Sequence, residues 1–144
     1  MERSCRINGE RGSCVLITVE EFERTDPECE SDANWLACTV RLKLPNLTFG
    51  YATSFQTHDF VRLSRGLKSL IALEADVCEF TSTENQLELS FSKSATGRVL
   101  VSGKALDNQT TVSFDIESDL TYLPELASQV DEIVRHFPVR YLSG

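Results

Sequence analysis

The side chains most often used in nucleophilic and acid–base catalysis are few and widely separated in this chain. Its two histidines are His58 and His136. Asp59 follows His58 directly, but adjacent residues of a helix point in different directions and do not form a working pair. No Ser or Cys motif accompanies either histidine, so a catalytic triad is unsupported. We expect a capping or surface role for His58, a structural role for His136, and no enzymatic activity.

Five cysteines are the other candidates for chemistry: Cys5, Cys14, Cys29, Cys38 and Cys78. None of them forms the short-spaced CxxC pair that zinc sites use. Cys14, Cys38 and Cys78 lie in strand-like stretches, where reduced thiols behave as small hydrophobic residues. Cys29 lies among carboxylates, which disfavour the reactive thiolate. No GxGxxG or GxxxxGK motif occurs, so we expect neither a metal nor another cofactor.

Acidic side chains are the most concentrated chemical feature of the sequence. The chain has 22 acidic and 14 basic residues, which give a formal net charge of −8. Between residues 20 and 32, seven acids and a single base, Arg24, leave a segment with a net charge of −6. The seven acids are Glu20, Glu21, Glu23, Asp26, Glu28, Glu30 and Asp32. This balance argues against nucleic acid and anionic membranes as partners, and it is compatible with a basic protein partner.

Three interpretations of this acidic segment remain open. It is a docking loop for a basic surface, or a solvated loop that keeps neighbouring strand edges soluble. A calcium loop is the third interpretation, but the spacing lacks the DxDxDG pattern and its terminal Glu. Our functional hypothesis is the docking loop.

The rest of the sequence predicts the elements that position this segment. Apolar alternation and turn signals predict strands at 13–22, 34–44, 47–56, 76–81, 86–93, 97–105 and 110–117. Helical spacing of apolar residues predicts helices at 57–73 and 121–137. In the first helix, Thr57 is the expected N-terminal cap, and Gly66 would allow a close approach to the sheet. In the second, Pro124 fits only the first turn.

The predicted fold is therefore α+β. We expect an antiparallel sheet of about seven to eight strands curved around the two helices, in a single domain spanning residues 1–144. Neither a signal peptide nor an apolar run of about 20 residues is present, so we expect a cytoplasmic protein without a membrane span.

Residues 32–36, DANWL, join the acidic segment to the strand at 34–44. Asp and Asn side chains bond neighbouring backbone amides and fix turns, and a Trp can anchor a core while its indole N–H finds a partner. We interpret Asp32, Asn34 and Trp35 as a structural corner. The alternative is that Asp32 and Asn34 project into a surface pocket.

The DANWL word and a C-terminal helix closing on Arg135-His136-Phe137-Pro138 resemble the WapI-like family of small bacterial immunity proteins. The resemblance covers most of the chain, which departs from the family in its lone Trp and its Cys-rich N-terminal half. It implies a protein that binds and occludes a toxin, with no catalytic residues to carry over. Many such toxins are basic nucleases, and an acidic protein would reach them faster through electrostatic steering.

We therefore predict a non-enzymatic protein-binding module, most plausibly an immunity protein whose leading contact is the acidic segment. The competing hypothesis is a small-ligand-binding or sensory domain, which would use a pocket between sheet and helix.

Overall fold

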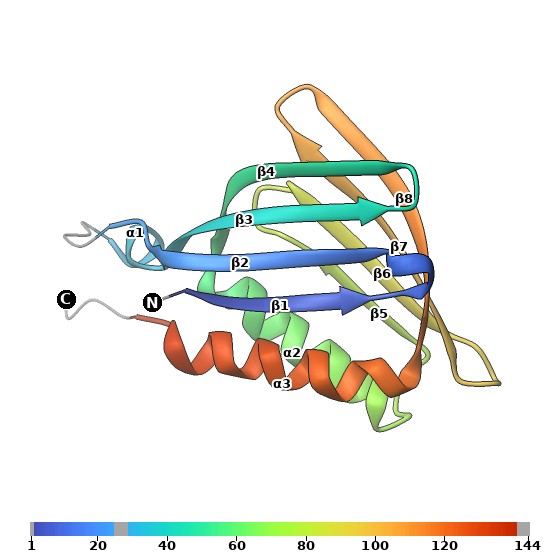
Figure 1. Ribbon diagram of the computed structural model, residues 1–144. Helices are drawn as coiled ribbons and strands as arrows, with labels where there is room; N and C mark the ends of the chain where they lie inside the picture. Colours follow the sequence, from blue (N-terminus) through green and yellow to red (C-terminus); the bar gives the residue numbers. More distant parts are fainter. Residues whose placement is uncertain (1, 25–28, 141–144) are drawn as a thin grey trace.

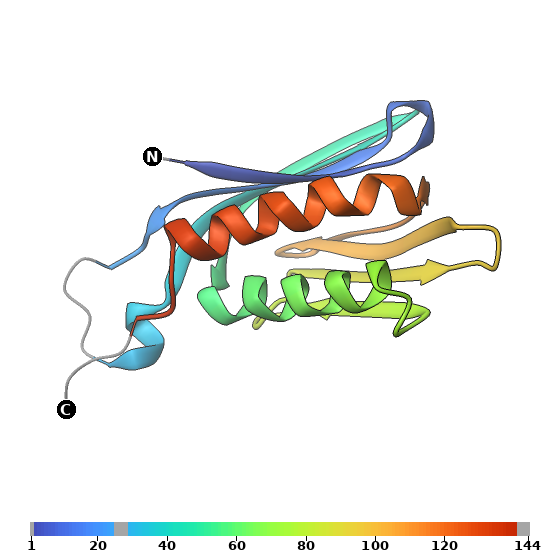
Figure 2. The same ribbon diagram turned by 90° about the horizontal axis from the view of Figure 1, so that it is seen from below.

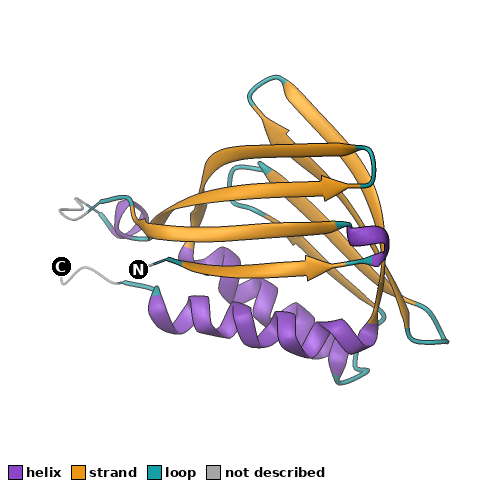
Figure 3. Cartoon of the chain, in the orientation of Figure 1, coloured by secondary structure: helices purple, strands orange, loops and turns teal. Residues whose placement is uncertain are grey.

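The computed structural model describes residues 2–24 and 29–140, which form two antiparallel sheets and two long helices (Figures 1 and 3). The first sheet contains β1 (Arg3–Asn8), β2 (Cys14–Phe22), β3 (Trp35–Leu44) and β4 (Leu47–Gln56), in chain order. The second contains β5 (Val77–Thr81), β6 (Leu87–Lys93), β7 (Arg98–Asp107) and β8 (Thr110–Asp119), also in chain order. Every neighbouring pair is antiparallel.

Two helices close the space between the sheets. Helix α2 (Thr57–Ile71) connects β4 to β5, and α3 (Leu123–His136) follows β8. The helices pack against each other, with α3 along β1 and α2 along β5 (Figure 2). None of the helices in the described part of the chain is long and apolar enough to cross a membrane.

The predicted α+β class, with antiparallel strands and two long helices, is confirmed. Both helices are slightly shorter than predicted, and Pro124 lies in the first turn of α3 as expected. The strands divide into two sheets because α2 carries the chain across from one to the other. Three short elements were not predicted: α1 (Glu30–Ala33) and the 3-10 turns η1 (Glu10–Gly12) and η2 (Leu120–Tyr122). Strand β1, whose outward side chains are Ser4, Arg6 and Asn8, was also not predicted.

The start of α2 is fixed by Asp59 and not by Thr57. Gln56 is the N-cap, and its backbone N–H donates to Asp59 Oδ2 at 2.9 Å in a capping box. The Asp59 carboxylate is fully buried and also accepts from Thr83 N at 3.2 Å and Thr83 Oγ1 at 2.8 Å. One carboxylate therefore satisfies the helix terminus and holds the β5–β6 loop against it. The prediction that Thr57 caps the helix is wrong.

Glycine at position 66 lets α2 approach the second sheet closely, as predicted. A Cβ at this position would lie 2.5 Å from the Sγ atom of Cys78 on β5. The apolar stripe of α2 continues this contact into the core with Phe60, Leu63 and Leu67, all of them buried.

At the start of β3, the side chains face the opposite sides of the sheet from those predicted. Leu36 is fully buried and belongs to the core, whereas Trp35 is half-buried on the other face and lies outside the core cluster. Val40 and Leu42 are buried, and in a strand only residues separated by an even number share a face. The expectation that Trp35 anchors the core is therefore wrong, because Leu36 holds that position.

The two sheets meet at the β1–β2 turn. Ser118 Oγ on β8 donates to the Asn8 carbonyl at 2.6 Å, and Arg98 on β7 forms an ion pair with Glu10 in the turn. A Cβ added at Gly9 would lie 2.0 Å from Ile116 Cγ2 and 2.8 Å from the Glu117 carbonyl oxygen. Only a residue without a side chain allows this approach.

We predict that Gly9→Ala destabilises the fold, because its methyl group overlaps backbone and side-chain atoms of β8. Overpacking of this kind costs about 1 to 3 kcal/mol. Urea denaturation measures the loss. The matched control is Gly50→Ala on β4, whose Cβ would make an ordinary 3.6 Å contact and should change stability by less than about 0.5 kcal/mol. Equal stability of the two variants would contradict the close packing of the sheets.

Candidate functional site

The acidic segment begins on the outer face of the first sheet, at the end of β2. A β-bulge shifts the register between Val19 and Glu21, so that Glu20 and Glu21 are both exposed. Glu23 is exposed too, and its carboxylate accepts a hydrogen bond from Ser54 Oγ on β4. A bulge at a strand end redirects side chains locally, and here it presents consecutive carboxylates to solvent.

The structure describes the other four acids of this segment only in part. Asp26 and Glu28 lie outside the described residues, and Glu30 is described only through its backbone in α1. Asp32, also in α1, is half-buried.

The predicted corner is organised by the buried side chain of Asn34. Its Oδ1 accepts from Arg140 N at 2.7 Å and from Thr57 Oγ1 at 3.0 Å, and its Nδ2 donates to the Arg140 carbonyl at 2.8 Å. The Asn34 backbone carbonyl accepts from Thr57 N at 3.0 Å. Asn34 therefore joins the start of β3, the start of α2 and the segment after α3. It has a structural role and does not project into a surface pocket.

Arg140 reinforces the same corner. Its guanidinium lies 3.7 Å above the centre of the Phe22 ring, a cation–π geometry, and it donates to the Ala33 carbonyl. It also reaches the Arg24 carbonyl at 3.1 Å. The C-terminal segment thus holds both ends of the acidic segment by direct contacts at residues 22–24 and 33–34.

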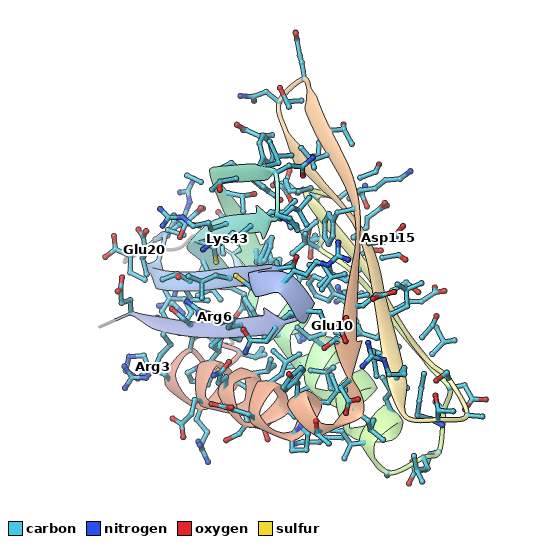
Figure 4. All side chains as sticks on the ribbon, turned by 45° about the vertical axis from the view of Figure 1, so that its right-hand side comes forward. Arg3, Arg6, Glu10, Glu20, Lys43 and Asp115 are labelled. Carbon is cyan, nitrogen blue, oxygen red and sulfur yellow. The ribbon has the colours of Figure 1, made fainter. Side chains whose placement is uncertain are left out.

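Basic side chains gather at the opposite end of the same sheet face (Figure 4). Arg6, Arg41 and Lys43 are exposed and line a hollow of about 430 Å³, with Cys14 and Leu16 between them. Sequence reasoning missed this cluster, because the three cations come from two strands that are far apart in the chain. Only the register, which places Leu16 opposite both Arg6 and Arg41, brings them together.

The outer face of the second sheet carries a wider, shallower hollow of about 610 Å³. Its lining combines exposed acids such as Glu79 and Asp115 with small polar residues, and Ser102 Oγ donates to Asp115 Oδ1 at 2.7 Å. Lys104 also lines it. This hollow is open, and the apolar side chains of Phe80, Leu89 and Phe114 also line it.

The interior between sheets and helices is packed with aromatic rings. Phe55 on β4 lies 5.7 Å from Phe60 on α2 and 6.2 Å from Phe80 on β5, between ring centroids. All three side chains are buried. At this position, side chains fill the space in which a small-ligand-binding domain would need its pocket.

Three buried cysteine thiols have a raised pKa, which disfavours the reactive thiolate. Burial raises the pKa of Cys5 to about 12 and that of Cys78 to about 11, and it also raises the pKa of Cys38. Cys5, Cys14, Cys38 and Cys78 form no disulfide. Within residues 2–24 and 29–140, no three His, Cys, Asp or Glu side chains gather closely enough to hold a metal ion.

Both histidines are exposed. His58 is exposed on α2, and His136 is exposed at the end of α3, where its ring packs edge-on against Phe137 at 4.8 Å.

Comparison with known proteins identifies both sequence and fold relatives. The model of the "Immunity protein WapI-like family" matches residues 6–138. No protein of curated function matches the chain. Among solved structures, a chain from "Crystal structures of trypanosoma bruciei MRP1/MRP2" superposes with a TM-score of 0.51 at 8% identity. The match covers 94% of this chain and 83% of that one, and at this identity the likeness concerns the fold alone.

We predict that Asn34→Leu destabilises the protein by about 2 to 5 kcal/mol. The change leaves the Arg140 N–H and carbonyl and the Thr57 hydroxyl without their partner, and buried unpaired polar groups are costly. Urea denaturation reports the loss, and limited proteolysis should cut the segment after α3 sooner. Asn8→Ala removes an exposed amide and serves as the control. A variant Asn34→Leu as stable as that control would contradict the corner.

We also predict that stability falls above pH 8.5. Unfolded thiols lose their proton near that pH, whereas Cys5 and Cys78 keep theirs in the folded protein, with pKa values of about 12 and 11. The unfolded state then binds fewer protons, so each thiol lowers the free energy of unfolding by about 2 kcal/mol between pH 8 and 10. Urea titrations at both pH values measure this. Cys5→Ala should reduce the pH effect, and Cys29→Ala should leave it intact; the reverse result would refute the assignment.

Proposed function

The chain belongs to the WapI-like immunity protein family, and from this premise we propose that it neutralises a basic bacterial toxin through the acidic segment. Binding would occlude the toxin's active site or an adjacent surface, and the protein itself would carry out no chemical step. The observation that carries the proposal is the exposed group of Glu20, Glu21 and Glu23 at the end of β2.

The support for this contact is electrostatic. These three carboxylates belong to the segment that holds a net charge of −6 out of the total of −8. A concentrated charge of one sign can raise the association rate with an oppositely charged protein by about 10- to 1000-fold. A nuclease is a suitable partner class, because its substrate-binding surface must be basic to hold an anionic substrate.

The corner contacts the described residues at both ends of this segment. Contacts of Arg140 with residues 22–24 and 33–34 hold both ends of the segment against the body of the protein. A docking element fixed at its ends loses less conformational entropy on binding than a free loop would. This favours a docking role over that of a purely solvated loop.

The test uses the toxin domain encoded by the neighbouring gene. Surface plasmon resonance at low and high salt should show that Glu20→Lys, Glu21→Lys and Glu23→Lys together lower the association rate by about 10- to 100-fold at low salt. The deficit should shrink at high salt, since ions screen exposed charges.

The control makes the same charge change elsewhere, with Glu74→Lys, Glu79→Lys and Glu84→Lys. These three glutamates are exposed and lie between α2 and β6. Equal loss in both triple variants would mean that net charge alone matters. An unchanged rate and salt dependence in the first variant would dismiss the acidic segment as the contact, and absence of toxin binding by the wild type would refute the proposed function.

A further inference from the structure

The outer face of the first sheet is not covered by either long helix. Side chains of β2 and β3 alternate, so that Thr18 and Thr39 point outward while Ile17 and Val40 enter the core. Helices α2 and α3 both lie on the inner side (Figures 1 and 2). No other element of the described chain packs on this face.

Charge is separated along this face. Its basic end carries Arg6, Arg41 and Lys43, and none of the three forms an ion pair with a described residue. Glu10 does not neutralise them, because it is paired with Arg98 on the second sheet. The cations therefore remain available to an external partner.

The acidic end of the face carries Glu2, Glu20, Glu21 and Glu23, all exposed. Figure 4 shows Glu20 toward one end of the first sheet, with Arg6 and Lys43 nearer the other. The face is thus a dipole with carboxylates at one end and unpaired cations at the other.

The centre between the two ends is marked by the Thr18–Thr39 pair, which lie opposite each other in register. Leu16 and Arg41 are two residues away on one side, and Glu20 is two residues away on the other. At about 3.3 Å per residue, the basic row and the start of the acidic end lie about 7 Å on either side of this pair. The side chains around the centre are small: Ser4, Thr18, Thr39 and Ala52.

We propose that this face binds a second copy of the chain in a two-fold symmetric dimer. A two-fold axis through the Thr18–Thr39 pair places the acidic end of each copy over the basic end of the other. In such an isologous contact each favourable pairing occurs twice. The small central residues allow the two sheets to approach to the usual distance of about 10 Å.

A second copy fits this surface better than a nucleic acid does. A polyanion would meet the three cations, but the carboxylates at the other end of the face and the net charge of −8 would repel it. In the dimer, both halves of the complementarity come from the same chain, and the charges at both ends are satisfied.

The area of this sheet face limits how strongly two copies can bind. Strands of 9 and 10 residues span about 30 Å, and four strands at about 4.8 Å spacing span about 19 Å. The footprint is therefore about 600 Å² per copy, at the lower limit for a specific interface. We expect a weak dimer that depends on salt. It would cover Glu20 and Glu21, so self-association and the proposed toxin contact would compete, although the dimer itself does not depend on the proposed function.

Sedimentation equilibrium under reducing conditions tests the proposal. From 5 to 500 µM protein, the wild type should pass from a monomer of 16.1 kDa toward twice that mass at low salt, and dissociate at least tenfold more readily at high salt. Two double variants each reverse the charge at one end of the face: Arg41→Glu with Lys43→Glu at the basic end, and Glu20→Lys with Glu21→Lys at the acidic end. Each alone should remain monomeric, because like charges then face each other.

An equimolar mixture of the two variants should dimerise again, since the four substituted positions then face residues of opposite sign. Misfolding of either variant cannot produce this rescue. The control, Arg65→Glu with Lys104→Glu, changes two exposed cations away from the face and should dimerise as the wild type does.

Several outcomes would overturn the proposal. A wild type that stays monomeric at 500 µM and low salt refutes the dimer, and a dimer that persists in both charge variants places the contact elsewhere. Failure of the mixture to associate would exclude the two-fold arrangement. Binding of a 12-nucleotide single-stranded DNA that is lost in the Arg41→Glu, Lys43→Glu variant, with the wild type monomeric, would assign the cations to nucleic acid instead.

Discussion

One buried amide, the side chain of Asn34, connects segments of the chain that are distant in sequence. Its oxygen accepts from the Arg140 N–H and the Thr57 hydroxyl, and its nitrogen donates to the Arg140 carbonyl. An amide suits this position because a carboxylate has no donor for that carbonyl and an aliphatic side chain has neither group. This side chain therefore holds the start of β3, the first residue of α2 and Arg140 after α3 together.

A second buried polar side chain, Asp59, acts in the same way at the same end of α2. Asp59 is fully buried, and its four hydrogen-bonding or ionic contacts come from the helix terminus, Arg62 and the β5–β6 loop. The side chains of Asn34 and Asp59 thus hold the start of α2 in place relative to both sheets. Aromatic rings fill the space between the sheets. Phe55, Phe60 and Phe80 occupy the interior, and the outer faces of the two sheets differ in their hollows and in the charged residues that line them.

The distribution of charge says more about this protein than its total. A net charge of −8 describes an acidic molecule, yet one sheet face combines a cluster of exposed carboxylates with a cluster of unpaired cations. Exposed charges within about a Debye length of each other act locally, so a partner meets each end of the face separately. The toxin contact that we propose would use the acidic end, and the dimer that we propose would use the complete face.

Local sequence patterns determined the elements and many of their buried faces. The 3.6-residue spacing of Phe60, Leu63 and Leu67 and the alternation of Val112, Phe114 and Ile116 predicted which sides turn inward, because periodicity reports burial within one element. The acidic segment and the structural nature of Asn34 were also visible, and the DANWL word indicated the family. The sequence did not show which face of the sheet Trp35 occupies, because two alternating patterns of apolar residues fit the start of β3 equally well.

Only the tertiary structure decided how distant segments combine. The partner of Asn34 is 106 residues away, the cations of the basic end come from β1 and β3, and the two-sheet arrangement depends on the path of α2. Strand register and long-range contacts leave no periodic trace in the chain, because each is fixed by which surfaces pack together and not by the residues of one element. The sequence therefore determined the secondary structure and the total charge, and the packing of the sheets decided where that charge is presented.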